Sequence, residues 1–420
     1  MFRYRIVIRA FTRKRDISSA SLISSLLQKM GHQVMITCTR DFNSVLRYWK
    51  PHLVLVNTFG ASLKAKKVDP NVKSIFIDGE SFFTESNPAA HYFKNLEAYN
   101  AMDEIFVWGE KMKKMINKNS KNSKNKPINV VGYPVLDLIK FAPKIEVKSK
   151  TIGFVMRQSL INNYKWDNAI KNIPFYDHLD RTLVQVKSFY WLIKCINQVL
   201  NKTNFKVSLR PHPREKTRTY IDNIEHWFGK ENAHRVEIDD SSVFIDWVKK
   251  QKSITTPTST SIVEAYLLRV PIINMSEIAG INVLYDHQDE MENECQKTGY
   301  MPKNMNEYLN LIKNNVVVNR NKKLDKLLQT LCTFHAKNNY SSCLEIAKRV
   351  DNFLKKEKTF RFPLIPKIIL ELKDALTYKM LKTKNEAYPD FNFYKGIHEG
   401  PKNLESITKD ILDKDKMIYS

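Results

Sequence analysis

The sequence predicts an α/β fold made of two doubly wound parallel sheets in tandem, followed by a helical tail. Short apolar runs alternate with helical patterns from Arg5 to Val131, and a second series of the same kind starts at Thr151. From Asn306 onward the periodicity is helical. Strands that alternate with helices are joined by crossovers, so they are expected to lie parallel within one sheet.

The first series predicts six strands, at 5–8, 33–36, 52–56, 73–77, 104–107 and 128–131. Helices are predicted at 19–30, near Val45, at 89–102 and up to Met115. Gly31 is a normal helix stop. Residues 117–126 are almost purely Asn, Lys and Ser, which predicts a solvated loop.

The second series predicts strands at 151–155, 206–209, 235–238, 253–255 and 271–274, with helices at 182–200, 215–228, 243–249 and 262–268. A basic, weakly patterned stretch before Lys150 marks the domain boundary. We therefore predict Rossmann-like domains at 1–145 and 146–350 and a basic helical tail at 351–420. Doubly wound sheets bind ligands outside the carboxyl ends of their strands, which points to a cleft between the two domains.

The composition is that of a soluble globular protein, with 43% hydrophobic and 27% charged residues. The formal charge of +24 suggests an anionic partner, but the chain is generally rich in Lys, Asn and Ile, so no nucleic-acid partner is predicted. Five scattered cysteines predict neither a metal site nor a disulfide framework, and no cofactor is expected. Without a signal peptide or a spanning apolar run, the expected location is cytoplasmic.

A basic loop follows the strand predicted at 206–209. It reads Arg210-Pro211-His212-Pro213-Arg214. Proline has no N–H, so side chains are the available donors, and the two cations and the imidazole suit a phosphate oxygen. The alternative is a rigid turn with solvated arginines.

A run of hydroxyl residues, Thr258, Ser259, Thr260 and Ser261, precedes the helix predicted at 262–268. Hydroxyls and free N–H groups at a helix start form an anion site, and Glu264 is placed to accept ribose hydroxyls. The alternative is an ordinary N-cap with Glu264 in a capping box. Both loops, on neighbouring strand positions of one domain, predict a nucleotide-phosphate site.

Two carboxylates, Asp78 and Glu80, flank Gly79 after the strand predicted at 73–77. One of them is a candidate base for an acceptor hydroxyl, with Asp78 directly after the strand. The alternative is an Asp-Gly turn. No dinucleotide-binding, P-loop or nucleophile-elbow motif occurs.

Together these motifs resemble those of bacterial GT-B glycosyltransferases, above all the sialyltransferase, polysialyltransferase and Kdo-transferase group and the surface carbohydrate biosynthesis proteins. The latter also have a counterpart of residues 131–137, Val-Gly-Tyr-Pro-Val-Leu-Asp. The resemblance implies that Asp78 or Glu80 is the acceptor base and that His212, Ser259 and Thr260 bind the donor phosphate. Two departures are the Asp-Gly-Glu order, where the family has two acids and then Gly, and Tyr133, where it usually has Asn.

The resemblance implies inverting, metal-independent transfer of a sugar, commonly a CMP-activated acid such as a nonulosonate or Kdo. The partners would be a nucleotide-sugar donor and a glycan or lipid-linked glycan acceptor of a cell-surface polysaccharide. Two alternatives remain: a CDP-glycerol-type polyol-phosphate transferase, and a non-catalytic nucleotide- or glycan-binding assembly protein. The amphipathic segment 362–381 either packs on the protein itself or lies on the inner face of the cytoplasmic membrane.

Overall fold

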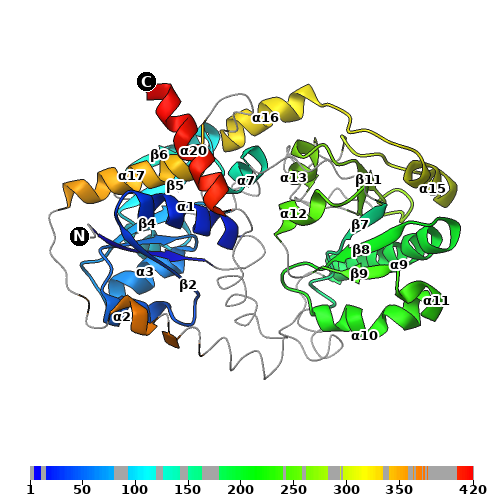
Figure 1. Ribbon diagram of the computed structural model, residues 1–420, viewed down its shortest axis with the longest axis horizontal. Helices are drawn as coiled ribbons and strands as arrows, with labels where there is room; N and C mark the ends of the chain where they lie inside the picture. Colours follow the sequence, from blue (N-terminus) through cyan, green and yellow to red (C-terminus); the bar gives the residue numbers. More distant parts are fainter. Residues whose placement is uncertain are drawn as a thin grey trace. The chain divides into compact units, whose positions relative to one another are not determined.

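The computed structural model describes residues 4–10, 16–79, 93–119, 126–141, 150–162, 179–239, 243–257, 262–281, 294, 297–333, 340–357, 363, 366–370, 372–373, 376 and 404–419. The chain forms two compact units (Figure 1). Unit 1 comprises Met1–Pro143 and Asp325–Ser420, and unit 2 comprises Lys144–Leu324.

The sheet of unit 1 is parallel throughout and has the order β2-β1-β3-β4-β5-β6. Its strands are β1 (Arg5–Arg9), β2 (Gln33–Thr37), β3 (Leu53–Val56), β4 (Lys73–Ile77), β5 (Glu104–Val107) and β6 (Ile128–Val130). The six predicted strands are confirmed. The direction of winding reverses between β1 and β3, and this reversal is where doubly wound sheets leave a crevice at their carboxyl edge.

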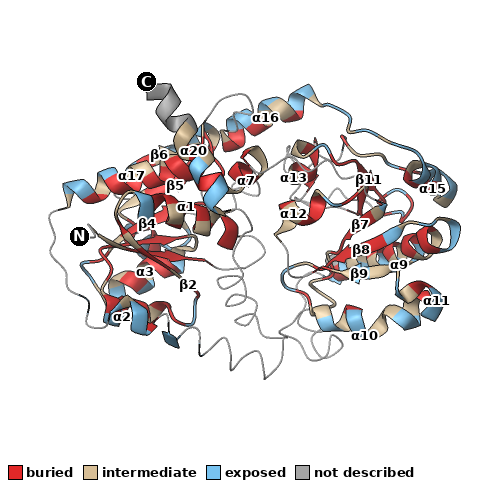
Figure 2. Cartoon of the chain, viewed as in Figure 1, coloured by how far each residue is buried: buried red, intermediate tan, exposed pale blue. Residues whose placement is uncertain are grey.

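Helices cover both faces of this sheet (Figure 1). The helices of unit 1 are α1 (Ile17–Lys29), α2 (Phe42–Trp49), α3 (Phe59–Val68), α5 (Leu96–Asn100), α6 (Glu110–Asn119), η2 (Pro134–Leu136), α7 (Asp137–Lys140), α16 (Lys322–Cys332, in unit 1 from Asp325), α17 (Ser342–Lys356) and α20 (Leu404–Tyr419). Helix α3 was not predicted from sequence, because only Ala61, Ser62 and Ala65 of its ten residues are buried. Figure 2 shows the buried residues concentrated on the strands and the inner helix faces.

Helix α17 packs in unit 1, whereas residues 342–350 were predicted to belong to the domain 146–350 and the rest of the helix to the tail. The buried Asp137 carboxylate accepts hydrogen bonds from Ser341 Oγ (2.7 Å), Cys343 N (2.7 Å) and Ser342 N (3.1 Å). It therefore caps the start of α17 across some two hundred residues of sequence, and burial raises the pKa of Asp137. Gly132 has a φ of +81°, and a side chain there would collide with Ser342.

The tail also contributes to unit 1. Leu370 is buried in the core that contains Phe42, Trp49 and Phe76. Helix α20 lies against α1, where Thr408 Oγ1 donates to Ser25 Oγ at 3.0 Å. These contacts agree with the expectation that the tail packs on the protein itself.

The sheet of unit 2 is also parallel throughout, in the order β11-β10-β7-β8-β9. Its strands are β7 (Thr151–Val155), β8 (Lys206–Arg210), β9 (Val236–Ile238), β10 (Ser253–Thr256) and β11 (Ile272–Asn274), as predicted. The helices are α9 (Leu179–Lys202), α10 (Thr217–Phe228), α11 (Lys230–Ala233), α12 (Phe244–Val248), α13 (Ile262–Leu267) and α15 (Met305–Lys313). The winding reverses between β7 and β10, which places the crevice of this sheet at their carboxyl ends.

Candidate functional site

The basic loop of unit 2 begins where β8 ends. Arg210, the last residue of β8, is only 3% exposed, and its Nη1 donates to Asp239 Oδ1 at 2.9 Å and to Asp239 O at 3.2 Å. This ion pair joins the ends of β8 and β9. Removing one partner would leave the other charge buried and uncompensated, so the pair holds the two strand ends together.

The His212 side chain is oriented by its own loop. The backbone N–H of Arg214 donates to His212 Nδ1 at 3.2 Å, so Nδ1 is an acceptor and the ring hydrogen lies on Nε2. His212 is half-buried, whereas Pro213 and Arg214 are exposed. The loop thus holds an imidazole with an Nε2–H donor beside an exposed guanidinium.

The Glu215 side chain is hydrogen-bonded to this loop. Its buried carboxylate accepts hydrogen bonds from His212 N (3.1 Å), Tyr220 Oη (2.8 Å) and Gln158 N. Burial, together with the adjacent carboxylate, raises the pKa of Tyr220 well above its usual value, so the hydroxyl remains a donor. Glu215 therefore ties the segment after β7 to the segment after β8. Glu215 was not predicted from sequence, because an acid just before a helix is common.

The hydroxyl loop is placed differently from the prediction. Strand β10 precedes it, but β7 lies between β8 and β10, so the two candidate phosphate loops do not follow neighbouring strands. Sequence order cannot reveal this, because the winding reverses at β7. Thr258, Ser259, Thr260 and Ser261 lie outside the described residues, and Glu264 is half-buried in the first turn of α13.

Gln158 follows β7, the strand that lies between β8 and β10. It is 1% exposed, and neither polar atom of its amide has a hydrogen-bond partner within the described part of the chain. Thr256 Oγ1 and Asn274 Nδ2, at the ends of β10 and β11, share that property. Gln251 Oε1 and Ser253 Oγ, at the amino end of β10, are also buried without a hydrogen-bond partner in the described part of the chain. Unpartnered polar atoms are therefore not confined to the carboxyl edge of the sheet.

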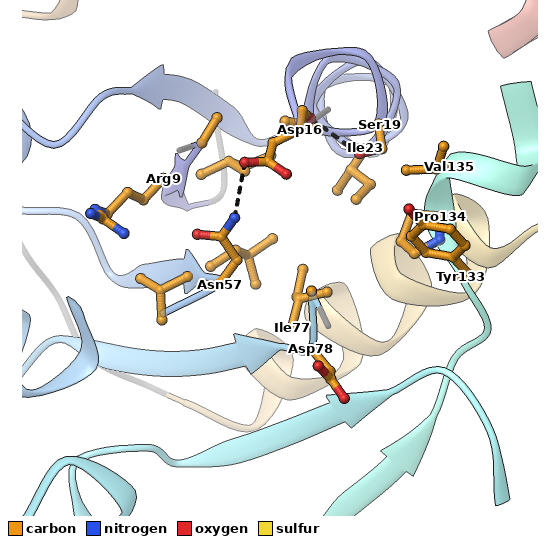
Figure 3. Close-up of a pocket in the computed structure, with 16 residues that line it drawn as sticks. Arg9, Asp16, Ser19, Ile23, Asn57, Ile77, Asp78, Tyr133, Pro134 and Val135 are labelled. Atoms are coloured by element: carbon orange, nitrogen blue, oxygen red, sulfur yellow. Dashed lines mark hydrogen bonds between the residues drawn. The ribbon is translucent and has the colours of Figure 1, made fainter. Parts of the chain in front are cut away.

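A pocket opens in unit 1 at the crevice between β1 and β3 (Figure 3). Asp78 lines it and is 4% exposed. The backbone of Asp78 is held from both sides: its N–H donates to Phe106 O at 2.9 Å, and its carbonyl accepts from Trp108 Nε1 at 2.6 Å. Trp108 in turn stacks on Tyr133, with ring centroids 3.8 Å apart. Tyr133, where the resembled family usually has Asn, is thus part of the pocket wall. Glu80 lies outside the described residues.

Further polar side chains line this pocket, among them Asp16, Asn57 and Arg9. Asn57 Nδ2 donates to Asp16 Oδ2 at 3.2 Å, joining the end of β3 to the start of α1 (Figure 3). Arg9 also lines the pocket, but its guanidinium is hydrogen-bonded to two hydroxyl groups. Nη1 donates to Thr58 Oγ1 at 2.8 Å, and Nη2 donates to Thr39 Oγ1 at 2.8 Å. Burial lowers the pKa of Arg9. Asp16 and Asn57 were not predicted from sequence; the available signals were the position of Asn57 directly after β3 and that of Asp16 directly before α1.

Among the described residues, no group of three or more His, Cys, Asp or Glu side chains is arranged to hold a metal ion. Within the same part of the chain, no helix combines the length and apolar character needed to cross a membrane.

No protein-family model matches the chain, and no curated protein matches it. Among solved structures, S. aureus MnaA in complex with UDP matches 86% of this chain and 99% of its own, with 13% identity and a TM-score of 0.51. The fold is GT-B-like. The UDP-GlcNAc 2-epimerase of Methanocaldococcus jannaschii, solved with UDP-GlcNAc and UDP, matches 84% of this chain and 99% of its own. The identity is 14% and the TM-score is 0.49.

HepE of Anabaena, solved with UDP-glucose, covers 84% of this chain and 100% of its own, at 11% identity and a TM-score of 0.38. At these identities, likeness concerns the fold alone. The GT-B-like architecture with two Rossmann-type units, predicted from the motif resemblance, is confirmed. The narrower likeness to the sialyltransferase and Kdo-transferase group stays a prediction.

Proposed function

We propose that this protein is an inverting, metal-independent glycosyltransferase that moves a sugar from a nucleotide donor to a hydroxyl of a cell-surface glycan. The observation that carries the proposal is the braced His212 loop at the carboxyl edge of the second sheet. In a GT-B-like fold, that edge is where a doubly wound sheet receives its ligand. MnaA, which has a similar fold, was solved with UDP, and this supports a nucleotide partner.

The donor phosphate is assigned to His212, Arg214 and the hydroxyl loop. His212 Nε2–H would donate to a phosphate oxygen and stabilise the charge that develops as the nucleotide departs. Ser259 and Thr260, with Thr258 and Ser261 beside them, would donate to the same phosphate, and Glu264 would accept from the ribose. Arg210 has a different part: its pairing with Asp239 holds the strand end from which the loop starts.

Asp78 or Glu80 serves as the base in this proposal. The carboxylate takes the proton of the acceptor hydroxyl, whose oxygen forms a bond to the anomeric carbon. The bond from that carbon to the phosphate oxygen breaks on the opposite side, and the nucleotide leaves with the bonding electrons. The configuration at the anomeric carbon is therefore inverted.

The leaving nucleotide can be identified by thermal unfolding in the presence of CMP, CDP, UDP or GDP, because a ligand bound only by the folded state raises the melting temperature. The motif resemblance favours CMP, whereas the MnaA structure contains UDP. At least one nucleotide should stabilise the protein. If none does, the proposed nucleotide site is wrong.

His212→Ala should remove most of this nucleotide-dependent stabilisation and of the turnover while leaving the melting temperature of the free protein almost unchanged. His226→Ala is the matched control, since His226 is an exposed histidine on α10. Equal responses of the two variants would contradict the phosphate role of His212.

Three measurements separate the proposal from its rivals. Chelation with EDTA should leave turnover intact; abolished turnover would overturn metal independence. A product without the donor's phosphate excludes the polyol-phosphate transferase. Replacement of both Asp78 and Glu80 by Ala should abolish polymer in cells while the protein still folds. A non-catalytic assembly protein does not need these carboxylates as a base, so loss of polymer would count against that alternative.

We further assign the tail to the anionic inner face of the cytoplasmic membrane. Ile368, Ile369, Leu372 and Leu376 are 51–64% exposed, while Leu370, between them, is buried in unit 1. Lys367 accompanies this stripe in a chain whose formal charge is +24, whereas Lys373 Nζ lies 3.4 Å from Asp41 Oδ1. Apolar side chains bordered by lysines suit the surface of an anionic bilayer.

A further inference from the structure

Helix α9 packs on the sheet of unit 2 with one of its sides (Figure 1). On that side, Leu192, Cys195, Ile196 and Val199 lie in the core of the unit. Strand β8 and helices α10 and α15 contact the helix. An outer helix surface is normally polar, but the outer surface of α9 carries large apolar side chains.

Four of these side chains form a continuous stripe along the first three turns of α9. Leu179, Leu183, Val186 and Tyr190, together the α9 stripe, are each 49–56% exposed. Single exposed apolar residues are common, whereas a contiguous set indicates an interaction surface. The steps of four, three and four residues are those of the a and d positions of a coiled coil. A second helix with the same spacing therefore fits the stripe.

Opposite charges border the α9 stripe along one flank. Asp180 follows Leu179 and Lys187 follows Val186, so each lies one position beyond a stripe residue. Both side chains are exposed. Lys187 Nζ donates to Gly280 O at 2.9 Å, which uses one of its three N–H groups. The flank thus offers one acid and one base to a partner.

An antiparallel pair of α9 helices satisfies every residue of the stripe. In the register that places Leu183 opposite the partner subunit's Val186, Leu179 lies opposite the partner subunit's Tyr190. The two-fold axis repeats both contacts, which gives four apolar layers. Such a contact uses the same surface on both copies and closes on itself, so assembly stops at two.

The same register also pairs the charges. A two-fold axis perpendicular to antiparallel helices brings like flanks together, and Asp180 is then offset from the partner subunit's Lys187 by only about 3 Å along the helix. A lysine side chain spans that offset, and the axis generates a second, identical pair. In a parallel pair this flank would instead face Thr182 and Phe189, which carry no charge.

We propose that α9 is a dimer interface, in which the α9 stripes of two copies of this chain pack antiparallel and Asp180 pairs with Lys187 of the partner subunit. One helix face is smaller than the interface of about 1,200–2,000 Å² of a stable complex, so the dissociation constant should be about 10–100 µM. The chain is then monomeric at submicromolar concentration. The interface goes beyond the proposed transferase function and does not require it.

Sedimentation equilibrium of the full chain from about 1 to 200 µM tests the interface, because the wild type should pass from monomer to dimer over this range. Leu183→Ser should raise the dissociation constant at least about tenfold, since each dimer loses two buried leucines. Ile221→Ser is the matched control, because Ile221 is 46% exposed on α10 of the same unit. This control should dimerise like the wild type.

Charge reversal tests the antiparallel register. Asp180→Lys alone brings two lysines together at each end of the stripe, and Lys187→Asp alone brings two aspartates together, so each variant should dimerise about tenfold more weakly. In a mixed dimer of the two variants, both pairs again have opposite charges. An equimolar mixture should therefore regain the association of the wild type, which also shows that both variants fold.

A wild type that stays monomeric at the highest concentration overturns the inference. A dimer that survives Leu183→Ser, or that Ile221→Ser weakens equally, also overturns it. A mixture of the charge variants that associates no better than either alone refutes the pairing of Asp180 with Lys187. A monomer that binds phosphatidylglycerol vesicles through Leu183 assigns the stripe to lipid instead. The nucleotide-dependent rise in melting temperature tests the transferase proposal separately.

Discussion

Glu215 is the residue whose replacement most directly tests the architecture of the proposed donor site. Three donors, from Gln158, His212 and Tyr220, converge on its buried carboxylate. In Glu215→Gln the side chain keeps its size, but one acceptor oxygen becomes an N–H₂ group that faces donors. In Glu215→Ala all three donors lose their acceptor.

The expected cost follows from those three bonds. A buried donor left without an acceptor costs about 1–3 kcal/mol, so Glu215→Gln should lower the free energy of unfolding of unit 2 by about that amount. Glu215→Ala, which orphans three donors, should cost roughly 3–6 kcal/mol after water enters the space left behind. For a unit of this size, each kcal/mol corresponds to about 2–4 °C in melting temperature.

The functional consequence should exceed the loss of stability. Glu215 holds the backbone of His212 and the segment that begins at Gln158, so its loss frees both segments beside the proposed phosphate. The assay is calorimetric unfolding with and without the nucleotide that stabilises the wild type. Glu225→Gln is the control, because this exposed glutamate of α10 undergoes the same chemical change.

An unchanged melting temperature in Glu215→Gln would refute the bracing role. A lowered melting temperature with full nucleotide affinity would show that the brace serves folding alone and that the His212 loop does not depend on it. Only a combined loss, absent from Glu225→Gln, agrees with the proposal.

Three further predictions concern other parts of the chain. Ser259→Ala combined with Thr260→Ala should weaken nucleotide binding by about 1–3 kcal/mol, and calorimetry that finds unaltered affinity would contradict the phosphate role of this loop. Hydrogen bonds from Lys297, Asn321 and Lys323 lower the pKa of Glu294 to about 2. Its stabilising contribution is therefore present above its usual pKa of 4.5 and declines as pH falls toward 2. The melting-temperature advantage of the wild type over Glu294→Gln should shrink over that interval, and an advantage independent of pH would refute the assignment. Ile368→Ser with Leu372→Ser should weaken sedimentation with phosphatidylglycerol vesicles by about tenfold. The equally exposed control Leu183→Ser with Val186→Ser should not, and equal binding by both double variants would exclude the tail as the membrane contact.

The sequence predicted the order and type of the elements well, because their signals are local. Residues 73–77, 104–107 and 151–155 form strands with the predicted bounds. Helix α3 was missed because its fully buried residues are Ala61, Ser62 and Ala65, whose small side chains leave little apolar periodicity to recognise. The basic loop was correctly placed at a strand end, since apolar residues stop and prolines follow within a few positions.

The parts of the candidate site that the sequence missed depend on long-range neighbours. Glu215 has no motif of its own, and it becomes informative only when Gln158 and His212 are seen to share its carboxylate. Asp16 and Asn57 are 41 residues apart and meet only because β1 and β3 are adjacent in the sheet.

The sequence by itself determined two series of parallel strands, a basic His-Pro loop after one of them and an acid after another. Periodicity and turn chemistry identify which face of a segment is buried, but not what covers it. Tertiary structure decided the rest: β7 lies between β8 and β10, Asp137 binds the start of α17 within unit 1, and Asp16, Asn57 and Asp78 line one pocket beside β1. These outcomes follow from strand order and from buried hydrogen bonds between distant segments, which no local pattern encodes.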